Sequence, residues 1–343
     1  MSRALELARP HHPHPNPRVG AVVVSSRGEV LGEGAHHRVG ADHAEVVALG
    51  AAGPEAQGAT LYVTLEPCTH HGRTPPCVDA IIAAGIARVV VAVTDPDERV
   101  AGEGLARLRE AGIEVVEGVG ADQARELDPA YFHHRETGMP RVTLKYAMTL
   151  DGAVAAVDGT SRWISGEEAR RDAHRLRAQA DAVVVGAGTL RTDDPLLTVR
   201  LEEYGGFQPV PVVVVGKDPL PESARLWERK PVVVAAGPVP LPSGQLVEVA
   251  DRDGLPDPVA TCRALADLGY LDLLLEGGPR LAQAWWRAGV VTRGVVYLAG
   301  RVAGGAGISP LAGRFESIED AVEVHITEVR TLGDDIRVDF EQV

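Results

Sequence analysis

Short apolar runs alternate with amphipathic segments through the first 120 residues of the chain. The apolar runs are typical of buried strands, and the amphipathic segments, each closed by a glycine, are typical of helices. The predicted strands are VGAVVV (19–24), ATLYVTL (59–65), RVVVAV (88–93) and IEVVEGV (113–119). The predicted helices are 43–52, 78–84 and 104–111. Strands that alternate with helices indicate a layered α/β sheet.

The same alternation restarts after a polar stretch, and no internal repeat relates the two halves. The second half begins with RVTLKYAMTLDG at residue 141. Its predicted strands are DAVVVG (181–186), PVVVVG (211–216), PVVVAA (231–236), LDLLLEGG (271–278) and RGVVYLAG (293–300), and its predicted helices are 258–269 and 280–289. The polar stretch ends at Gly138 and Pro140. We therefore predict an α/β domain at 1–120, a linker at 121–140 and a second α/β domain at 141–343.

Length and composition fit this division. A chain of 343 residues with 45% hydrophobic content can fill two cores. The N-terminus has no apolar run of signal-peptide length, and no later segment approaches ~18 uncharged apolar residues. We therefore expect a soluble, cytoplasmic protein that does not bind a membrane. Its three cysteines are an odd number, which disfavours a disulfide framework and favours thiolate chemistry or burial.

The charge is acidic and evenly shared. Residues 1–140 carry 12 Arg and 19 Asp/Glu, the remainder carries 22 Lys/Arg and 29 Asp/Glu, and each part has a net charge of −7. Binding to a phosphate backbone needs a basic face. We therefore expect no nucleic-acid partner.

The chemistry of the first domain centres on HAE at 43–45 and on EPCTHHGRTPPC at 66–77. Asp42 is a suitable N-cap, which would place His43 and Glu45 in the first turn of a helix. Cys77 follows a proline at another helix start, where the dipole favours a thiolate. His43, Cys68 and Cys77 provide three ligands for Zn²⁺ and leave a fourth position for water, as in a catalytic site. Glu45 is then placed to carry a proton from that water to a departing amine.

Other interpretations of these residues remain open. His43 and Glu45 alone would fit an ordinary surface helix start, and His70 or His71 could replace one zinc ligand. A zinc-stabilised scaffold would need no Glu45 and would have a fourth protein ligand. His11, His12 and His14 lie among prolines and are expected to be solvated. Cys262 lies on an apolar helical stripe and is expected to be a small core residue.

The second domain has weaker motifs. VGAGTL at 185–190 continues with Leu190 where the dinucleotide fingerprint needs glycine, so it is incomplete. EGGPRLAQAWW at 276–286 predicts a strand, a turn and a helix, where free backbone N–H groups could hold a phosphate. A tight turn that needs a positive φ explains the same glycines equally well.

Taken together, PNPRVGAVVV, HAE, TLEPCTHHGRTPPC and DPDERVAGEG resemble one branch of the zinc nucleobase deaminases. They are similar to the N-terminal domain of the bifunctional riboflavin-biosynthesis deaminase/reductase, in which an insertion also displaces the second cysteine. The resemblance implies a cytidine-deaminase-like α/β/α fold. It also implies that Asn16 faces the substrate, and that His70, His71, Gly72 and Arg73 form a loop near its phosphoribosyl part.

The second domain resembles the reductase domain of the same enzyme. The similar stretches are TLKYAMTLDG, GTSRWISGEEARRDAHRLRAQADAVVVGAGTLRTDDPLLTVR and LLLEGGPRLAQAWW. The resemblance implies a dihydrofolate-reductase-like fold that uses NADPH. The residues that it implies for the cofactor are Ala147, Trp163, Thr189, Asp193, Gly278, Pro279, Arg280, Leu281, Ala282, Gln283 and Ala284. Those implied for the substrate are Asn16 in the first domain and Lys145, Ser161, Arg177, Leu197, Arg200 and Glu276 in the second.

For three of these residues the sequence leaves another interpretation open. Arg177 and Arg200 can supply the guanidinium forks that a sugar phosphate calls for, but solvated arginines are equally compatible with the pattern. Trp163 could be a core residue. The cofactor carries the hydride, so no side chain is assigned as the proton donor of this step.

The resemblance implies two consecutive reactions on a pyrimidine that carries a ribose phosphate. A diaminopyrimidinone would be deaminated hydrolytically with Zn²⁺ and Glu45, and the ribosyl group of the product would be reduced to ribityl with NADPH. A homo-oligomer is expected. A deaminase of free nucleosides or of tRNA would share HAE and the cysteines, but it would not need the reductase half.

Overall fold

The computed structural model describes residues 1–69, 75–97, 101–216, 219–314 and 316–342. The chain divides into two compact units, Met1–Met139 and Pro140–Val343, and each is an α/β unit. The predicted fold class is therefore confirmed. Within the described ranges, every helix is too short or too polar to cross a membrane.

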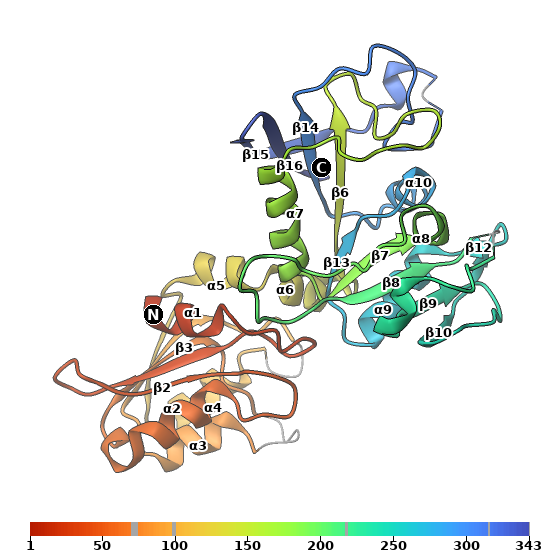
Figure 1. The fold of residues 1–343 in the computed structure, drawn as a ribbon. Helices are drawn as coiled ribbons and strands as arrows, with labels where there is room; N and C mark the ends of the chain where they lie inside the picture. The colour runs from red at the N-terminus through yellow and green to blue at the C-terminus, as the bar shows by residue number, and fades with distance from the viewer. Residues whose placement is uncertain (70–74, 98–100, 217–218, 315, 343) are drawn as a thin grey trace. The chain divides into compact units, whose positions relative to one another are not determined.

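The first unit is built on a five-stranded sheet with the order β2, β1, β3, β4, β5 (Figure 1). β1 pairs antiparallel with β2 and β3, and β3, β4 and β5 run parallel to one another. The strands are β1 (Gly20–Val24), β2 (Val30–Ala35), β3 (Thr60–Leu65), β4 (Arg88–Val93) and β5 (Glu114–Glu117). Four of the five follow the predicted apolar runs. β2 was not predicted, because its sequence VLGEGA contains two glycines and a glutamate.

Helices cover both faces of this sheet: α2, α3 and α4 lie on one face, and α1 and α5 lie on the other (Figure 1). The helices are α1 (Ser2–Ala8), α2 (Ala44–Ala52), α3 (Cys77–Ala83), α4 (Glu103–Glu110), α5 (Ala121–Leu127) and α6 (Pro129–Thr137), with a 3-10 turn η1 (Gly53–Ala56). Residues 121–137, assigned to a linker from the sequence, are therefore two helices of the first unit. Ala124, Leu127, Tyr131 and Phe132 are buried on them, which explains why this polar stretch is folded.

Two close backbone approaches place the elements that carry the predicted zinc ligands. A Cβ on Gly34 of β2 would lie 2.2 Å from the carbonyl oxygen of Ala44, so only glycine allows the start of α2 to come this close. A Cβ on Gly104 of α4 would lie 2.2 Å from the carbonyl oxygen of Pro67. The first contact fixes the helix start beside His43. The second fixes the turn that leads into Cys68.

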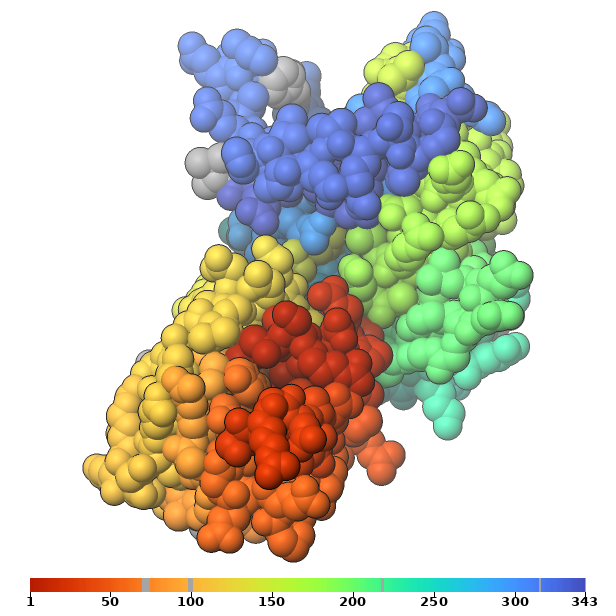
Figure 2. Space-filling model, turned by 90° about the vertical axis from the view of Figure 1, so that its left-hand side faces the viewer, coloured from red at the N-terminus to blue at the C-terminus, as the bar shows by residue number. Residues whose placement is uncertain are grey.

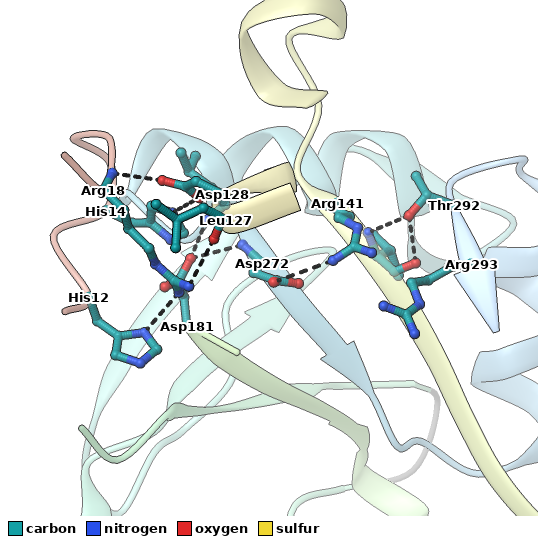
Figure 3. A network of polar contacts seen from close by, with 12 residues as sticks. His12, His14, Arg18, Leu127, Asp128, Arg141, Asp181, Asp272, Thr292 and Arg293 are labelled. Carbon is teal, nitrogen blue, oxygen red and sulfur yellow. Dashed lines mark hydrogen bonds and ion pairs between the residues drawn. The ribbon is translucent and has the colours of Figure 1, made fainter. Parts of the chain in front are cut away.

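The prediction that the histidines near the N-terminus are solvated is wrong for His14. Its side chain is 2% exposed, and Nε2 lies 2.8 Å from Oδ1 of Asp128. Arg18 donates its backbone N–H to the other oxygen of Asp128 at 2.8 Å and its guanidinium to the carbonyl of Leu127 (Figure 3). A buried carboxylate needs such partners, and it draws the proline-rich N-terminal segment onto the loop before α6.

The second unit contains a nine-stranded sheet with the order β10, β9, β8, β7, β13, β6, β14, β16, β15 (Figure 1). All neighbours from β10 to β14 are parallel, and β16 and β15 are added antiparallel. The strands are β6 (Arg141–Thr149), β7 (Ala182–Gly186), β8 (Val210–Val214), β9 (Val232–Ala235), β10 (Gln245–Glu248), β13 (Asp272–Leu275), β14 (Arg293–Ala299), β15 (Val324–Leu332) and β16 (Asp335–Gln342). β11 (Asp251–Arg252) and β12 (Leu255–Pro256) form a separate small hairpin.

The valine-rich strands β7, β8 and β9 form the centre of the core in this unit, and α7 packs against it through Ala169 and Leu176. The helices are α7 (Glu167–Gln179), α8 (Ala187–Asp193), α9 (Pro258–Asp267) and α10 (Pro279–Arg287), with 3-10 turns η2 (Arg225–Arg229) and η3 (Ile318–Asp320). Cys262 on α9 is fully buried, which confirms the prediction of a core cysteine. Burial raises the pKa of its thiol to about 12, so the thiol stays protonated and is a poor nucleophile.

The C-terminal hairpin of β15 and β16 was not predicted, because its alternation is inverted. The charged residues Asp335, Arg337 and Asp339 of β16 are buried, together with Phe340. Arg337 donates to Asp172 at 2.6 Å and to Asp339 at 2.7 Å, which makes burial of these charges tolerable. β15 is almost wholly exposed and forms part of the blue surface in Figure 2.

Candidate active sites

The three predicted zinc ligands come together from three separate segments of the first unit. His43 is the residue directly before α2, Cys68 follows β3, and Cys77 is the first residue of α3. Their ligand atoms all lie within 4.8 Å of one another. The N-cap predicted at Asp42 was one residue early. The N-cap of α2 is His43, which has an extended backbone. Asp42 lies outside the helix, and its carbonyl contacts Nδ1 of His36.

The electrostatics of this site favour a thiolate. Nδ1 of His43 lies 3.1 Å from Sγ of Cys77 and 3.5 Å from Sγ of Cys68, and the Cys77 N–H donates to Sγ of Cys68 at 3.4 Å. Hydrogen bonding from the Cys77 thiol and from His43 lowers the pKa of Cys68 to about 4. The pKa of Cys77 is raised, because its proton is held by Cys68. One imidazole and two clustered sulfurs, one of them with a lowered pKa, form a donor set that fits Zn²⁺.

Glu45 lies beside this cluster in the first turn of α2 and is 3% exposed. Burial, together with the negative charge on Cys68, raises the pKa of this carboxyl to about 7. It also interacts with the thiol of Cys77. A buried carboxyl next to three metal ligands, with an unusually high proton affinity, has the properties of a general acid and base.

Asn16 is connected to the metal cluster through a histidine that sequence reasoning missed. Nδ2 of Asn16 lies 3.0 Å from Nε2 of His36, and the His36 ring meets the His43 ring edge to face at 5.3 Å. His36 is 3% exposed, and burial lowers its pKa. The available signal was the His-His pair at 36 and 37, six residues before HAE. The predicted loop of His70, His71, Gly72 and Arg73 lies outside the described residues.

In the second unit, several predicted substrate residues meet at the end of β13. Arg177 of α7 donates Nε to Oε1 of Glu276 at 2.6 Å and Nη2 to Oε2 at 2.8 Å. Nζ of Lys145, on β6, lies 3.9 Å from the same carboxylate. Although burial opposes it, Arg177 and Lys145 lower the pKa of Glu276 to about 2, and burial lowers the pKa of Lys145.

Leu197 and Arg200 lie on a segment without regular secondary structure that runs beside this cluster. Arg177 donates Nη1 to the carbonyl of Thr198 at 3.0 Å, which brings the neighbouring Leu197 close to the Arg177–Glu276 ion pair. Leu197 is 2% exposed. Arg200 is exposed, and burial of part of its side chain and the charge of Arg177 lower its pKa. Guanidinium and ammonium groups of three residues thus gather around one carboxylate, which leaves an excess of positive charge.

The predicted cofactor residues fall into two groups. The turn at Gly278 starts α10, and a Cβ on Gly278 would meet only Oγ1 of Thr189, at 3.4 Å. The first turns of α8 and α10 therefore lie next to each other, and no side chain caps either helix. Pro279, Arg280, Leu281, Ala282, Gln283 and Ala284 are the first six residues of α10.

The remaining cofactor residues lie at the far end of α8, in the segment after β6 and on β6 itself. Arg162, between Ser161 and Trp163, donates Nη2 to the carbonyl of Asp193 at 2.9 Å. The Trp163 ring is 58% exposed and lies under the guanidinium of Arg170 at 4.7 Å, so it is not a core residue. Ala147 lies on β6, paired with Tyr297 of β14.

Comparisons with known proteins match each of the two units to a protein family. Residues 140–338 match the family described as the RibD C-terminal domain, and residues 1–93 match the cytidine and deoxycytidylate deaminase zinc-binding region. The riboflavin biosynthesis protein RibD of Aquifex aeolicus is 42% identical, over 100% of this chain and 97% of that protein. The structure of Acinetobacter baumannii RibD, form 1, is similar with a TM-score of 0.90 and 35% sequence identity. The match covers 100% of this chain and 97% of the Acinetobacter chain.

A structure from Thermotoga maritima, described as a diaminohydroxyphosphoribosylaminopyrimidine deaminase/5-amino-6-(5-phosphoribosylamino)uracil reductase, is also similar. Its TM-score is 0.89 at 33% identity, with the same coverage of 100% and 97%. The fold, the clustered ligands and these matches define a class of protein: a bifunctional enzyme with a zinc-binding deaminase domain and a reductase domain. The chain belongs to the RibD family of riboflavin biosynthesis proteins, as its motifs predicted.

Proposed function

We propose that the first unit deaminates 2,5-diamino-6-(5-phosphoribosylamino)pyrimidin-4(3H)-one hydrolytically to 5-amino-6-(5-phosphoribosylamino)uracil. The observation that carries this proposal is the approach of His43, Cys68 and Cys77 to within 4.8 Å beside the buried Glu45. The similar Thermotoga maritima protein, described as a deaminase and reductase of these two compounds, supports the choice of substrate.

Each residue of this site has a distinct role in the proposal. His43, Cys68 and Cys77 hold the zinc ion, which when bound activates water as a nucleophile near neutral pH. Glu45 takes a proton from the attacking water and passes it to the leaving amine. Asn16, held by His36, presents its amide to the pyrimidine. Burial of Glu45 keeps bulk water from competing for that proton.

The second unit then reduces the ribosyl side chain of the deaminated product to ribityl. NADPH, when bound, supplies the hydride. The adjacent starts of α8 and α10 hold its phosphates through backbone N–H groups, with Thr189 and the residues from Gly278 to Ala284 lining the cofactor. Ala147, Trp163 and Asp193 complete this lining. The two helix starts without a side-chain cap and the open space beside Gly278 fit a phosphate group.

The substrate of the second step is bound by the cluster around Glu276. Arg177 and Arg200 present guanidinium groups to the ribose phosphate, with Lys145 adding positive charge. Ser161 and Leu197 contact the remainder of the substrate. The excess of positive charge around one carboxylate supports this assignment.

The working environment of the enzyme follows from the same observations. We place it in the cytoplasm, because two cysteines must stay reduced to bind metal, and free thiols persist in a reducing compartment. We propose no nucleic-acid or membrane partner, since the net charge is −14. A homo-oligomer is supported by β15, an exposed edge strand that carries Val324, Ile326 and Val329.

One experiment tests both activities. The diaminopyrimidinone is supplied to the zinc-loaded enzyme with and without NADPH, and ammonia and ribityl product are followed separately. We expect ammonia in both cases and ribityl product only with NADPH. Glu45→Gln should retain zinc and should still reduce the deaminated intermediate, but it should release no ammonia. Ammonia release by Glu45→Gln at the wild-type rate would refute the role of this carboxyl.

A further inference from the structure

Residues 196–200, which carry the proposed phosphate ligand Arg200, are held by side chains and not by a neighbouring strand. They form neither helix nor strand in the structure. Arg229 donates Nη1 to the carbonyls of Leu196 at 2.9 Å and of Leu197 at 3.1 Å. Such a segment has the freedom of a loop unless these hydrogen bonds fix it.

The next three residues of this segment are held by Gln208 and by side chains of α7. Gln208 binds both backbone groups of Val199: Oε1 accepts its N–H at 2.8 Å, and Nε2 donates to its carbonyl at 3.3 Å. Two side chains of α7 hold the residues on either side of Val199 in the sequence. Arg177 donates to the carbonyl of Thr198, and Nδ1 of His174 accepts the backbone N–H of Arg200 at 3.3 Å. The contact that holds the backbone of Arg200 itself is therefore the hydrogen bond to the His174 imidazole.

The protonation state of His174 follows from its contact. A ring nitrogen that accepts a backbone N–H carries no proton, so the proton of the neutral ring is on Nε2. Burial, followed by the charges of Arg177 and Arg200, lowers the pKa of His174 to about 4. The imidazole is therefore a stable acceptor at neutral pH and adds no charge to the cluster.

His174 also has a suitable position on its helix. It precedes Arg177 by three residues on α7, so both side chains lie on the same face. Arg177 is fixed by Glu276, and this ion pair fixes the helix face from which His174 reaches the Arg200 backbone. A long guanidinium side chain can meet a phosphate with a defined geometry only if its own backbone is in place.

We propose that His174 is a positioning residue that holds the backbone of Arg200 so that its guanidinium meets the phosphate of the reductase substrate. This inference rests on the proposed binding role of Arg200. His174 itself touches neither substrate nor cofactor in the proposal, so it acts through Arg200 alone.

The test is a double-mutant cycle on the reduction of 5-amino-6-(5-phosphoribosylamino)uracil. His174→Leu removes the acceptor, whereas His174→Asn places an amide oxygen near the position of Nδ1. The loss of one hydrogen bond should raise KM about three- to tenfold in His174→Leu, with kcat changed by less than about twofold. His174→Asn should restore KM to within about twofold. In an Arg200→Ala background, His174→Leu should add nothing further.

Controls within the same chain separate the outcomes. Ammonia release by the first unit and NADPH binding by the second should be unchanged in every variant, which shows that both units are folded. A KM increase by His174→Leu that persists in the Arg200→Ala background would overturn the inference but not the role of Arg200. An unchanged KM in Arg200→Ala would overturn the proposed binding role and the inference with it. Equal KM increases in the Leu and Asn variants would show that the acceptor atom is irrelevant.

Discussion

Arg177 and Glu276 form a two-point ion pair, with Nε to Oε1 at 2.6 Å and Nη2 to Oε2 at 2.8 Å. The Arg177 side chain is 14% exposed and that of Glu276 is 9% exposed. The planar fork fixes the guanidinium in one orientation, as bidentate pairing does. Because both charges are largely buried, the removal of one leaves the other without adequate compensation.

We therefore expect Arg177→Ala to destabilise the second unit by about 3 kcal/mol. Arg171→Ala is the matched control, since Arg171 lies on the same helix but pairs with Glu167 at the surface, and it should cost less than about 0.5 kcal/mol. The four tryptophans all lie after residue 140, so the urea dependence of their fluorescence reports this unit alone. Equal midpoints for the two variants would contradict the buried pair.

The acid stability of the second unit should depend on Glu276. Its pKa is about 2 in the folded unit, below the ordinary value of 4.5, so its stabilisation is complete above about pH 4.5 and is lost as the pH falls toward about 2. Glu276→Gln should be less stable at pH 7, but its free energy of unfolding should fall less across that window. Tryptophan fluorescence in urea at several pH values measures this. Glu202→Gln, at an exposed position, should follow the wild type.

The sequence predicted those strands whose side chains are apolar on both faces. β1, β4 and β7 are such strands, and each lies within about one residue of its expected range. Period and composition could not predict β16, because its buried Arg337 is stabilised by Asp339 on the same strand together with Asp172 of α7, which is distant in sequence. The helices at 121–137 were missed for a related reason, since their polar residues outnumber the few that they bury.

The metal ligands could be predicted because their chemistry is local: a histidine at a helix start and cysteines that follow prolines. His36 could not be assigned in this way, since its partners Asn16 and Asp42 become neighbours only after β1, β2 and α2 are packed. The solvation predicted for His14 failed likewise. A proline-rich context gave no sign that Asp128 would reach it.

Zinc binding and deamination should depend on Cys68, and reduction should not. Cys68→Ser removes a thiolate ligand, so we expect zinc content and ammonia release to be lost. NADPH-dependent reduction of the deaminated intermediate should remain, because it occurs in the other unit. Cys262→Ser is the control for loss of a thiol, since that residue is buried on α9 and should leave the zinc content unchanged. Deamination by Cys68→Ser at the wild-type rate would show that the metal assignment is wrong.

Glu66 should stabilise the metal site without binding the metal. It is 4% exposed, and its carboxylate accepts four backbone N–H groups, from Asp95, Gly102, Gly104 and Leu105. These bonds fix the turn at Pro67 that leads into Cys68. In Glu66→Gln, an NH₂ group faces two of these donors, which should cost about 2–4 kcal/mol.

The expected result for Glu66→Gln is a lower melting temperature in calorimetry and faster loss of zinc to a chelator. Glu55→Gln, at an exposed position on η1, provides the comparison and should behave as wild type. If Glu66→Gln kept the wild-type rate of zinc loss, the anchored turn would not be what holds Cys68 in place.

The turn at Gly278 allows the proposed cofactor site to be tested apart from stability. Gly278 has φ −68°, and an added Cβ would meet only Oγ1 of Thr189, at 3.4 Å. The fold should therefore tolerate Gly278→Ala with a cost below about 1 kcal/mol. The same methyl group would occupy the space in which a phosphate approaches the helix start, so we expect NADPH affinity to fall by about tenfold or more.

Fluorescence titration with NADPH measures this affinity, and urea unfolding followed by tryptophan fluorescence measures the stability of the same sample. Gly205→Ala is the matched control, because its Cβ would meet nothing within 4 Å and Gly205 lies outside the proposed cofactor lining. It should leave both quantities unchanged. A loss of NADPH affinity in Gly278→Ala without loss of stability separates cofactor exclusion from unfolding. Wild-type affinity in that variant would instead show that the cofactor phosphates lie elsewhere than at the start of α10.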